Sequence, residues 1–367
     1  MSLHFSRDTK VYLEHTGRFW RIPVLDGFSF SQATNASEIT LSEMTSTAGK
    51  TRRARQMFND SYAPAEWSFQ SYMRPNTGLP VEDALWASFF TDANWDNAQK
   101  SWSSGVISGS ATALGMTISS SASNIPELQT FDLYFIMGAS KAPSSDDFTT
   151  GSSIQVYKIE NCIPNEASID FDVDGIATIN WSGFGKIITE AASMSTNNGA
   201  LLEARNITST DNYIRNRLTR LSLSSDDTTN FLDNYKITLT GGNITFTNNI
   251  TYLTPETLGR INQPLEHITG TRAINGNFTC YLGGGNDESA ELFEDLIEAT
   301  SVITNSFKLN FDIGGASGPK CSINLPKCHL EVPTHGIEDV ITLDTNFHAL
   351  PTDIDSANEV TITYTGA

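Results

Sequence analysis

The sequence predicts a mainly β protein made of two tandem, duplicated antiparallel β-sandwich domains, each with one packed α-helix. Three observations lead to this fold class. The second half repeats the motifs of the first in the same order, most apolar segments alternate with a period of two, and each half has one segment with the apolar spacing of a helix. Chance similarity would not stay collinear over five segments, so the repeat indicates a tandem duplication.

The repeat consists of five matched pairs of segments. They are 27–30 with 242–246, 69–73 with 278–282, 85–90 with 292–297, 131–138 with 307–314, and 177–180 with 341–344. The spacing between partners shortens along the chain, and it shortens most between Phe90 and Phe131. The first copy therefore contains extra residues at that point.

Two matched segments read as strands. Both place an apolar residue at every second position, namely Phe131, Leu133, Phe135 and Met137 in one copy and Phe307, Leu309, Phe311 and Ile313 in the other. In the second copy the intervening residues are Lys308, Asn310 and Asp312, so one face of that strand should meet water or a polar partner.

One helix is predicted in each half. Pro80 suits a first helical position, with Val81, Leu85 and Phe89 spaced by four residues behind it. Ser289 can cap its counterpart at 289–298, whose apolar stripe is Leu292, Phe293, Leu296 and Ile297.

The domain boundaries follow from the repeat. We expect a first domain at 1–190, a polar linker at 191–204 and a second domain at 205–367. The first domain has an insertion at about 91–127, rich in Ser, Gly and Asn and containing Trp95 and Trp102, which we expect to be a surface excursion.

Composition excludes several classes of protein. The chain has 42 acidic and 23 basic residues, a formal charge of −19, so a phosphate-gripping DNA-binding protein is not expected. No apolar run is long enough to cross a bilayer, and the first ten residues lack the apolar core of a secretory signal. Four cysteines in this length do not form a disulfide framework, so Cys162 and Cys328 are predicted to be buried free thiols.

No motif indicates catalysis, a cofactor or a metal. Residues 48–51 resemble the end of a phosphate-binding loop, but Met44 stands where that loop needs Gly. Residues 170–175 resemble the start of a calcium loop, but Trp181 stands where that loop needs Glu, so an acidic turn between strands is predicted. The six histidines have no metal-ligand spacing.

A basic cluster, Arg52, Arg53 and Arg55, stands out in this acidic chain. It lies in a long segment between two predicted strands. One interpretation is a solvated loop, and the other is a docking arm that meets acidic surface on another subunit.

Four extended segments, 58–69, 179–183, 248–255 and 290–297, resemble the major tail tube proteins of long flexible-tailed siphophages, of the type that fuses two tube domains. The resemblance runs from about residue 2 to about residue 353. It implies a structural virion protein, made in the bacterial cytoplasm, whose homotrimeric rings of pseudo-hexameric symmetry stack into a tube. It also implies an inner β-barrel through which double-stranded DNA reaches the host, and tape measure, tail tip and terminator proteins as partners.

The resemblance does not extend to every feature of that family. One member has a C-terminal immunoglobulin-like domain, for which the present sequence has no counterpart, so a decoration role is not carried over. We expect the strands facing the channel to be rich in Asp and Glu, and 131–137 and 307–313 are the candidate strands. Two other classes stay open: a tandem β-sandwich binding module, such as a phage adhesin or carbohydrate binder, and a depolymerase, which would need a catalytic cluster.

Overall fold

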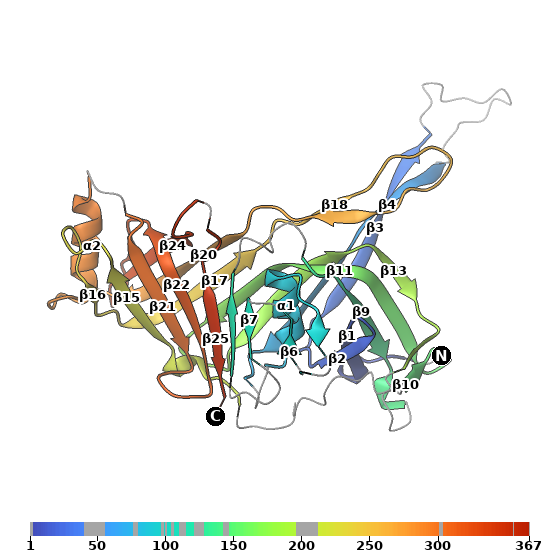
Figure 1. The fold of residues 1–367 in the computed structure, drawn as a ribbon, viewed down its shortest axis with the longest axis horizontal. Helices are drawn as coiled ribbons and strands as arrows, with labels where there is room; N and C mark the ends of the chain where they lie inside the picture. The colour runs from blue at the N-terminus through green and yellow to red at the C-terminus, as the bar shows by residue number, and fades with distance from the viewer. Residues whose placement is uncertain are drawn as a thin grey trace.

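The computed structural model describes residues 3–39, 56–75, 80–96, 99, 101–103, 106–109, 115–120, 128–141, 147–195, 212–300, 304–354 and 356–366. Over these residues the protein is mainly β, as predicted (Figure 1). The first half contains β1 (Thr9–His15), β2 (Arg18–Ile22), β3 (Ser29–Glu38), β4 (Met57–Tyr72), α1 (Asp83–Phe90), β5 (Trp95–Asp96), β6 (Ser101–Trp102), β7 (Ile107–Ser108), β8 (Gly115–Ser119), β9 (Phe131–Met137), β10 (Asp147–Thr149), β11 (Gln155–Phe171), β12 (Thr178–Gly185), β13 (Ile187–Glu190) and β14 (Ser193–Ser195).

The second half has a similar order of elements. It contains β15 (Arg220–Ser225), β16 (Asn234–Tyr235), β17 (Leu239–Thr247), β18 (Thr251–Leu253), β19 (Glu266–Ile268), β20 (Ala273–Tyr281), α2 (Ser289–Glu298), β21 (Phe307–Ile313), β22 (Lys320–Leu330), β23 (Thr334–Gly336), β24 (Thr342–Ala349) and β25 (Thr361–Thr365).

Each half has a second sheet, which we call its back sheet, and β8 and β7 of the first half extend the back sheet of the second. In the first half its strand order is β2, β1, β9, the start of β11, and β13. In the second half the order is β16, β15, β21, the start of β22, and β25. The remaining long strands form one sheet that both halves share, and the hydrophobic core lies between the shared sheet and the back sheets.

The long strands β11 and β22 take part in both layers because each is bent by a bulge. The register of β11 against β9 shifts between Ile159 and Cys162, and Cys162 then lies opposite Phe131. Cys328 of β22 lies opposite Phe307 beside a similar shift. A bulge bends a strand and increases its twist, which turns the end of each strand toward the other layer.

The cysteines at these bends are buried free thiols, as predicted. Burial raises the pKa of Cys162 and of Cys328, so both remain protonated and unreactive at neutral pH.

Both predicted helices are present, but their environments differ. All eight residues of α1 are buried, and Trp86 stacks on Phe90 with ring centroids 5.7 Å apart. In α2 only Ser289, Leu292 and Leu296 are buried.

Ser289 is not the cap of α2. Glu288 occupies the capping position, but its side chain makes no capping hydrogen bond to the helix. Ser289 Oγ instead donates to the carbonyl oxygen of Tyr281 at 2.7 Å and accepts from the amide of Gly283 at 2.8 Å, which ties the helix start to β20.

The insertion at about 91–127 is not a surface excursion in its described part. Trp95 and Trp102 are only 8% and 4% exposed, and Trp102 stacks on Trp20 at 5.5 Å. Strand β8 pairs with β25, with Ser119 opposite Thr361. Burial of the aromatic area draws the insertion inward, and the edge of β25 supplies hydrogen-bond partners for β8.

The predicted alternation of 307–313 is confirmed, since its four apolar residues are fully buried. In β9 the polar face is lost, because Tyr134 and Ile136 are also buried, under Phe148 and Met194 of the β10–β14 pair.

The predicted turn at 170–175 is present between β11 and β12, with Gly175 at φ 109°.

Candidate functional site

The shared sheet runs through both halves without a break. Its order is β3, β4, β12, the end of β11, β17, β20, β24 and finally the end of β22 followed by β23. The two halves meet where β11 pairs with β17, from Glu166 opposite Thr247 to Phe171 opposite Gly242. The strands around this junction lie at the centre of the molecule in Figure 1.

One face of the shared sheet is mainly polar. Because strand residues alternate between faces, the apolar residues point into the core and the polar ones point away from it. We call this surface the polar face, and its members are Ser29, Ser31, Glu66, Ser68, Gln70, Glu166, Ser168, Asp170, Thr178, Asn180, Ser182, Asn243, Thr245, Thr247, Asn275, Asn277, Thr279, Asp344, Asn346 and His348.

The strand segments of the shared sheet contain no Lys or Arg, while the polar face has the carboxylates Glu66, Glu166, Asp170 and Asp344. The cationic strand residues lie in the back sheets instead: Lys10, Arg18, Arg21, Lys158, Arg220, Lys308, Lys320 and Lys327. The separation of charge between the two layers makes the polar face an anionic surface.

Neutral donors hold two of these carboxylates, Asp170 and Asp344, in place. Asp170 accepts hydrogen bonds from the amide nitrogens of Asn180 at 3.2 Å and Asn243 at 2.5 Å, across the junction of the halves. Asp344 accepts from Asn277 and Thr279, both at 3.2 Å. These donors fix the side chains without neutralising their charge.

The polar face has one groove in each half, at the same position in the strand order. A groove of about 320 Å³ lies over β3, β4 and β12, and one of about 460 Å³ lies over β17, β20 and β24. Beneath the first, Trp67 lies opposite Gly183, and beneath the second, Gly276 lies opposite Phe347. A Cβ added at Gly183 would come within 2.5 Å of the Trp67 ring, and one at Gly276 within 2.6 Å of the Phe347 ring. Each half thus pairs one large with one small residue. The large residue is on β4 in the first half, but in the second half it is on β24, the strand that matches β12.

A comparison with known protein families identifies the family of this chain. The model of the phage tail tube protein family matches residues 25–365. The chain belongs to the phage tail tube protein family. It is also similar to the tail tube protein pb6 of Escherichia phage T5, with 27% identity over 371 residues that cover 98% of this chain and 75% of that protein.

The predicted resemblance is confirmed, and the chain is a structural protein of the virion tail rather than an enzyme. No helix among the described residues is long and apolar enough to cross a membrane. Among those residues no cluster of His, Cys, Asp and Glu is arranged to hold a metal ion.

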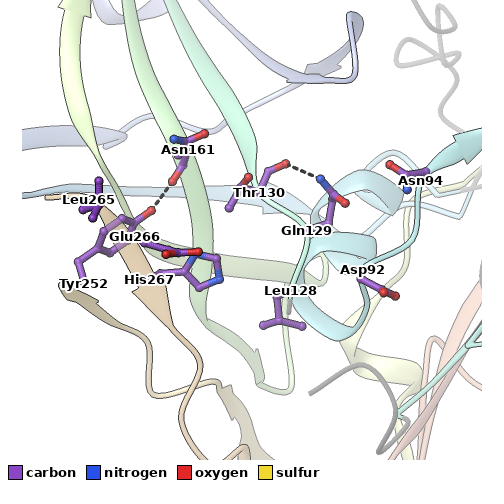
Figure 2. Close-up of a pocket in the computed structure, with 10 residues that line it drawn as sticks. All are labelled: Asp92, Asn94, Leu128, Gln129, Thr130, Asn161, Tyr252, Leu265, Glu266 and His267. Carbon is purple, nitrogen blue, oxygen red and sulfur yellow. Dashed lines mark hydrogen bonds between the residues drawn. The ribbon is translucent and has the colours of Figure 1, made fainter. Parts of the chain in front are cut away.

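The tail tube protein has a larger cleft of about 770 Å³ between its halves (Figure 2). The first half contributes Asp92, Asn94, Leu128, Gln129, Thr130 and Asn161, and the second contributes Tyr252, Leu265, Glu266 and His267. Tyr252 donates its hydroxyl hydrogen to the Asn161 carbonyl, which closes one end. Burial lowers the pKa of His267, so this ring is neutral at pH 7.

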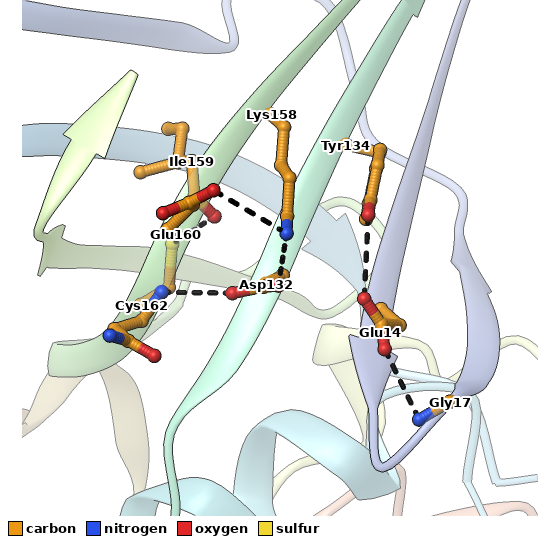
Figure 3. A network of polar contacts seen from close by, with 9 residues as sticks. Glu14, Gly17, Asp132, Tyr134, Lys158, Ile159, Glu160 and Cys162 are labelled. Carbon is orange, nitrogen blue, oxygen red and sulfur yellow. Dashed lines mark hydrogen bonds and ion pairs between the residues drawn. The ribbon is translucent and has the colours of Figure 1, made fainter. Parts of the chain in front are cut away.

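The back sheet of the tube protein compensates its cations locally (Figure 3). Lys158 Nζ lies 2.7 Å from Asp132 Oδ2 and 3.7 Å from Glu160 Oε1. Tyr134 donates to Glu14 at 3.4 Å, and burial raises the pKa of Tyr134 to about 12. In the back sheet of the first half, Lys158 and Tyr134 are therefore each bound to a carboxylate.

Arg52, Arg53 and Arg55 lie outside the described residues. The residues that flank their segment, Ile39 and Gln56, are hydrogen-bonded at 3.0 Å at the end of the β3–β4 hairpin. This hairpin projects from the body of the tube protein (Figure 1). The loop after β18 lies along it, where the amide of Tyr62 donates to the carbonyl of Asn262 at 2.9 Å.

The sequence reasoning missed the polar face of the shared sheet. The segments that it proposed for the channel, 131–137 and 307–313, lie in back sheets, and which strands face a channel stays a prediction. The signal that could have found the face is the lack of Lys and Arg from the strands around Trp67, Trp181 and Phe278.

Proposed function

We propose that three copies of this tail tube protein close a ring of six like domains, and that rings stack into the tail tube. The domains are 1–190 and 205–367, joined by the linker 191–204. The single observation that carries the proposal is the shared sheet, which joins two halves edge to edge and leaves β3 at one end and β23 at the other. Closure into a barrel removes such free edges.

Several features support the equivalence of the two domains. Both have a bulged Cys opposite Phe, a helix between matching strands, a groove at the same position and a large–small pair beneath it. A chain with two like domains fills two equivalent places around an axis, so three chains fill six.

The polar face of the shared sheet then lines the channel for double-stranded DNA. DNA has one negative charge per about 1.7 Å of duplex axis, so cationic strands would hold it and slow its passage. An anionic wall repels the duplex, and the Debye length of about 8 Å at physiological salt lets that repulsion act near the wall. Amide and hydroxyl side chains between the carboxylates keep the wall wetted.

In this role the tube meets other tail proteins. We propose the tape measure, tail tip and terminator proteins as these partners. The protein does not enter a membrane.

We expect electron microscopy of the concentrated, purified protein to show rings of three chains and stacked tubes, without added nucleotide or metal. Mass measurement of isolated rings checks the number of chains. A ring of six intact chains would contradict the proposal, and so would a protein that remains as single particles at every concentration and after addition of tube seeds.

Replacing Arg52, Arg53 and Arg55 together by Ser should shorten tubes or abolish them. Exposed ion pairs contribute only about 0–1 kcal/mol each, so each single change should be mild. The thermal midpoint of the monomer should stay unchanged, and a triple Lys variant that keeps the charge serves as the control. Tubes of normal length and salt resistance in the Ser variant would show that these residues do not dock.

A further inference from the structure

The two helices occupy matching places but are covered to different degrees. In α1 the rings of Trp86, Phe89 and Phe90 pack on Phe246 of β17 with centroids 5.6, 6.4 and 6.2 Å apart. Strand β17 belongs to the second half, so the junction between the halves covers α1. Helix α2 lies at one end of the molecule (Figure 1), and its Ile297 is 50% exposed.

The strand edge beside α2 is open as well. All three residues of β23 are exposed, and Ile337, which follows, is 81% exposed. Strand β23 pairs with β24 on one side, and no described strand pairs with its other side. At the far end of the shared sheet, β3 pairs only with β4 among the described strands.

The junction inside the chain shows how such an edge is covered. Ser168 of β11 lies opposite Asn180 of β12 on one side and opposite Thr245 of β17 on the other. In the second half, Thr334 lies opposite Asp344 of β24, the position that matches Asn180. Thr334 therefore takes the place of Ser168.

The position that matches Thr245 is found in the same way. Thr245 lies opposite Asn275 of β20, and Ser31 lies opposite Glu66 of β4. Phe69 and Phe278 fix the alignment of β4 with β20, since each faces the matching residue of the next strand, Trp181 or Thr345. Glu66 and Asn275 both precede these phenylalanines by three residues, so Ser31 takes the place of Thr245. The strand pairing thus corrects the sequence match of 27–30 with 242–246 by two residues, since that match would place Ser31 at Thr247.

We propose that the β23 edge of one copy pairs with the β3 edge of a second copy in the register of the β11–β17 junction. Thr334 then lies opposite Ser31, His335 opposite Phe30, and Gly336 opposite Ser29. The same contact covers the exposed end of α2 and Ile337. This inference rests on the proposed ring and adds its residue-level interface.

The test uses engineered disulfides in the full chain. Thr334→Cys with Ser31→Cys should give covalent dimers and trimers on a denaturing, non-reducing gel after oxidation of the assembled protein. Directly opposite residues have Cα atoms about 4.5–5.5 Å apart, within the range of a disulfide. The four native cysteines are buried, so they give no background.

A matched control shifts one partner by two residues on the same face. Thr334→Cys with Ser29→Cys places the Cα atoms too far apart for efficient closure, so we expect at least tenfold fewer covalent oligomers. Ser168→Cys with Thr245→Cys should close within one chain and verifies the oxidation. Rings of three chains in which the first pair does not cross-link, or in which the shifted pair cross-links equally, overturn the register and leave the ring itself standing. Protein that stays monomeric counts against both.

Discussion

Replacing Trp67 by Gly should lower the free energy of unfolding by about 3–5 kcal/mol, the usual cost of emptying a large aromatic site in a core. Trp67 is 2% exposed and donates from Nε1 to the carbonyl of Phe184 at 3.1 Å. Gly183 alone changed to Phe should also destabilise the protein, because its Cβ would clash with the Ile163 carbonyl oxygen and its ring would enter space that Trp67 fills.

The double variant, Trp67→Gly with Gly183→Phe, copies the arrangement of Gly276 and Phe347. We expect it to be more stable than the sum of the single effects predicts, by about 1–3 kcal/mol, as for residues that share one space. Denaturant unfolding of the four proteins measures this coupling. Strictly additive single effects would show that the two cross-strand positions are not equivalent, and would weaken the argument for duplicated domains.

Replacing Glu82 by Gln should remove a pH dependence of stability. Glu82 lies at the start of α1, fully buried, and Tyr364 of β25 donates to its Oε1 at 2.8 Å. Burial raises the pKa of Glu82 from 4.5 to about 8, with a smaller contribution from repulsion by Asp83. The hydroxyl of Tyr364 also accepts from Trp86 Nε1 at 2.9 Å, so this group connects the two halves.

The direction of this pH dependence follows from proton linkage. The folded state holds the Glu82 proton more tightly than the unfolded state, so the stability from this group is complete below pH 4.5 and is lost as the pH rises toward 8. At pH 7 the loss is on the order of 3 kcal/mol. We expect the thermal midpoint of the Gln variant to exceed that of the unchanged protein increasingly from pH 5 to pH 8. Parallel midpoint curves over that range would contradict this.

Local patterns allowed much of the fold to be predicted. Period-two alternation identified the strand of Phe307 and Phe311, and four-residue spacing identified the helices around Leu85 and Leu292. These patterns record which side of an element faces a core, and that information lies within a few residues.

Features that depend on long-range pairing could not be predicted. The Ser- and Gly-rich composition around Trp95 and Trp102 favours a loop, yet burial of both rings and pairing of β8 with β25 override it. The polar face was missed because its strands, unlike that of Lys308, have no alternating charge to mark them. Only the pairing of β11 with β17 shows that they form one surface.

The central claim is that the polar face of the shared sheet lines the channel of a three-chain ring. A reconstruction of the assembled tube by cryo-electron microscopy, at a resolution that shows side chains, tests it most directly. The account predicts that Glu66, Glu166, Asp170 and Asp344 of every chain face the lumen, with Lys158 and Lys308 turned away from it. A channel wall formed by β9 and β21, or a wall that presents those lysines to the DNA, would contradict it.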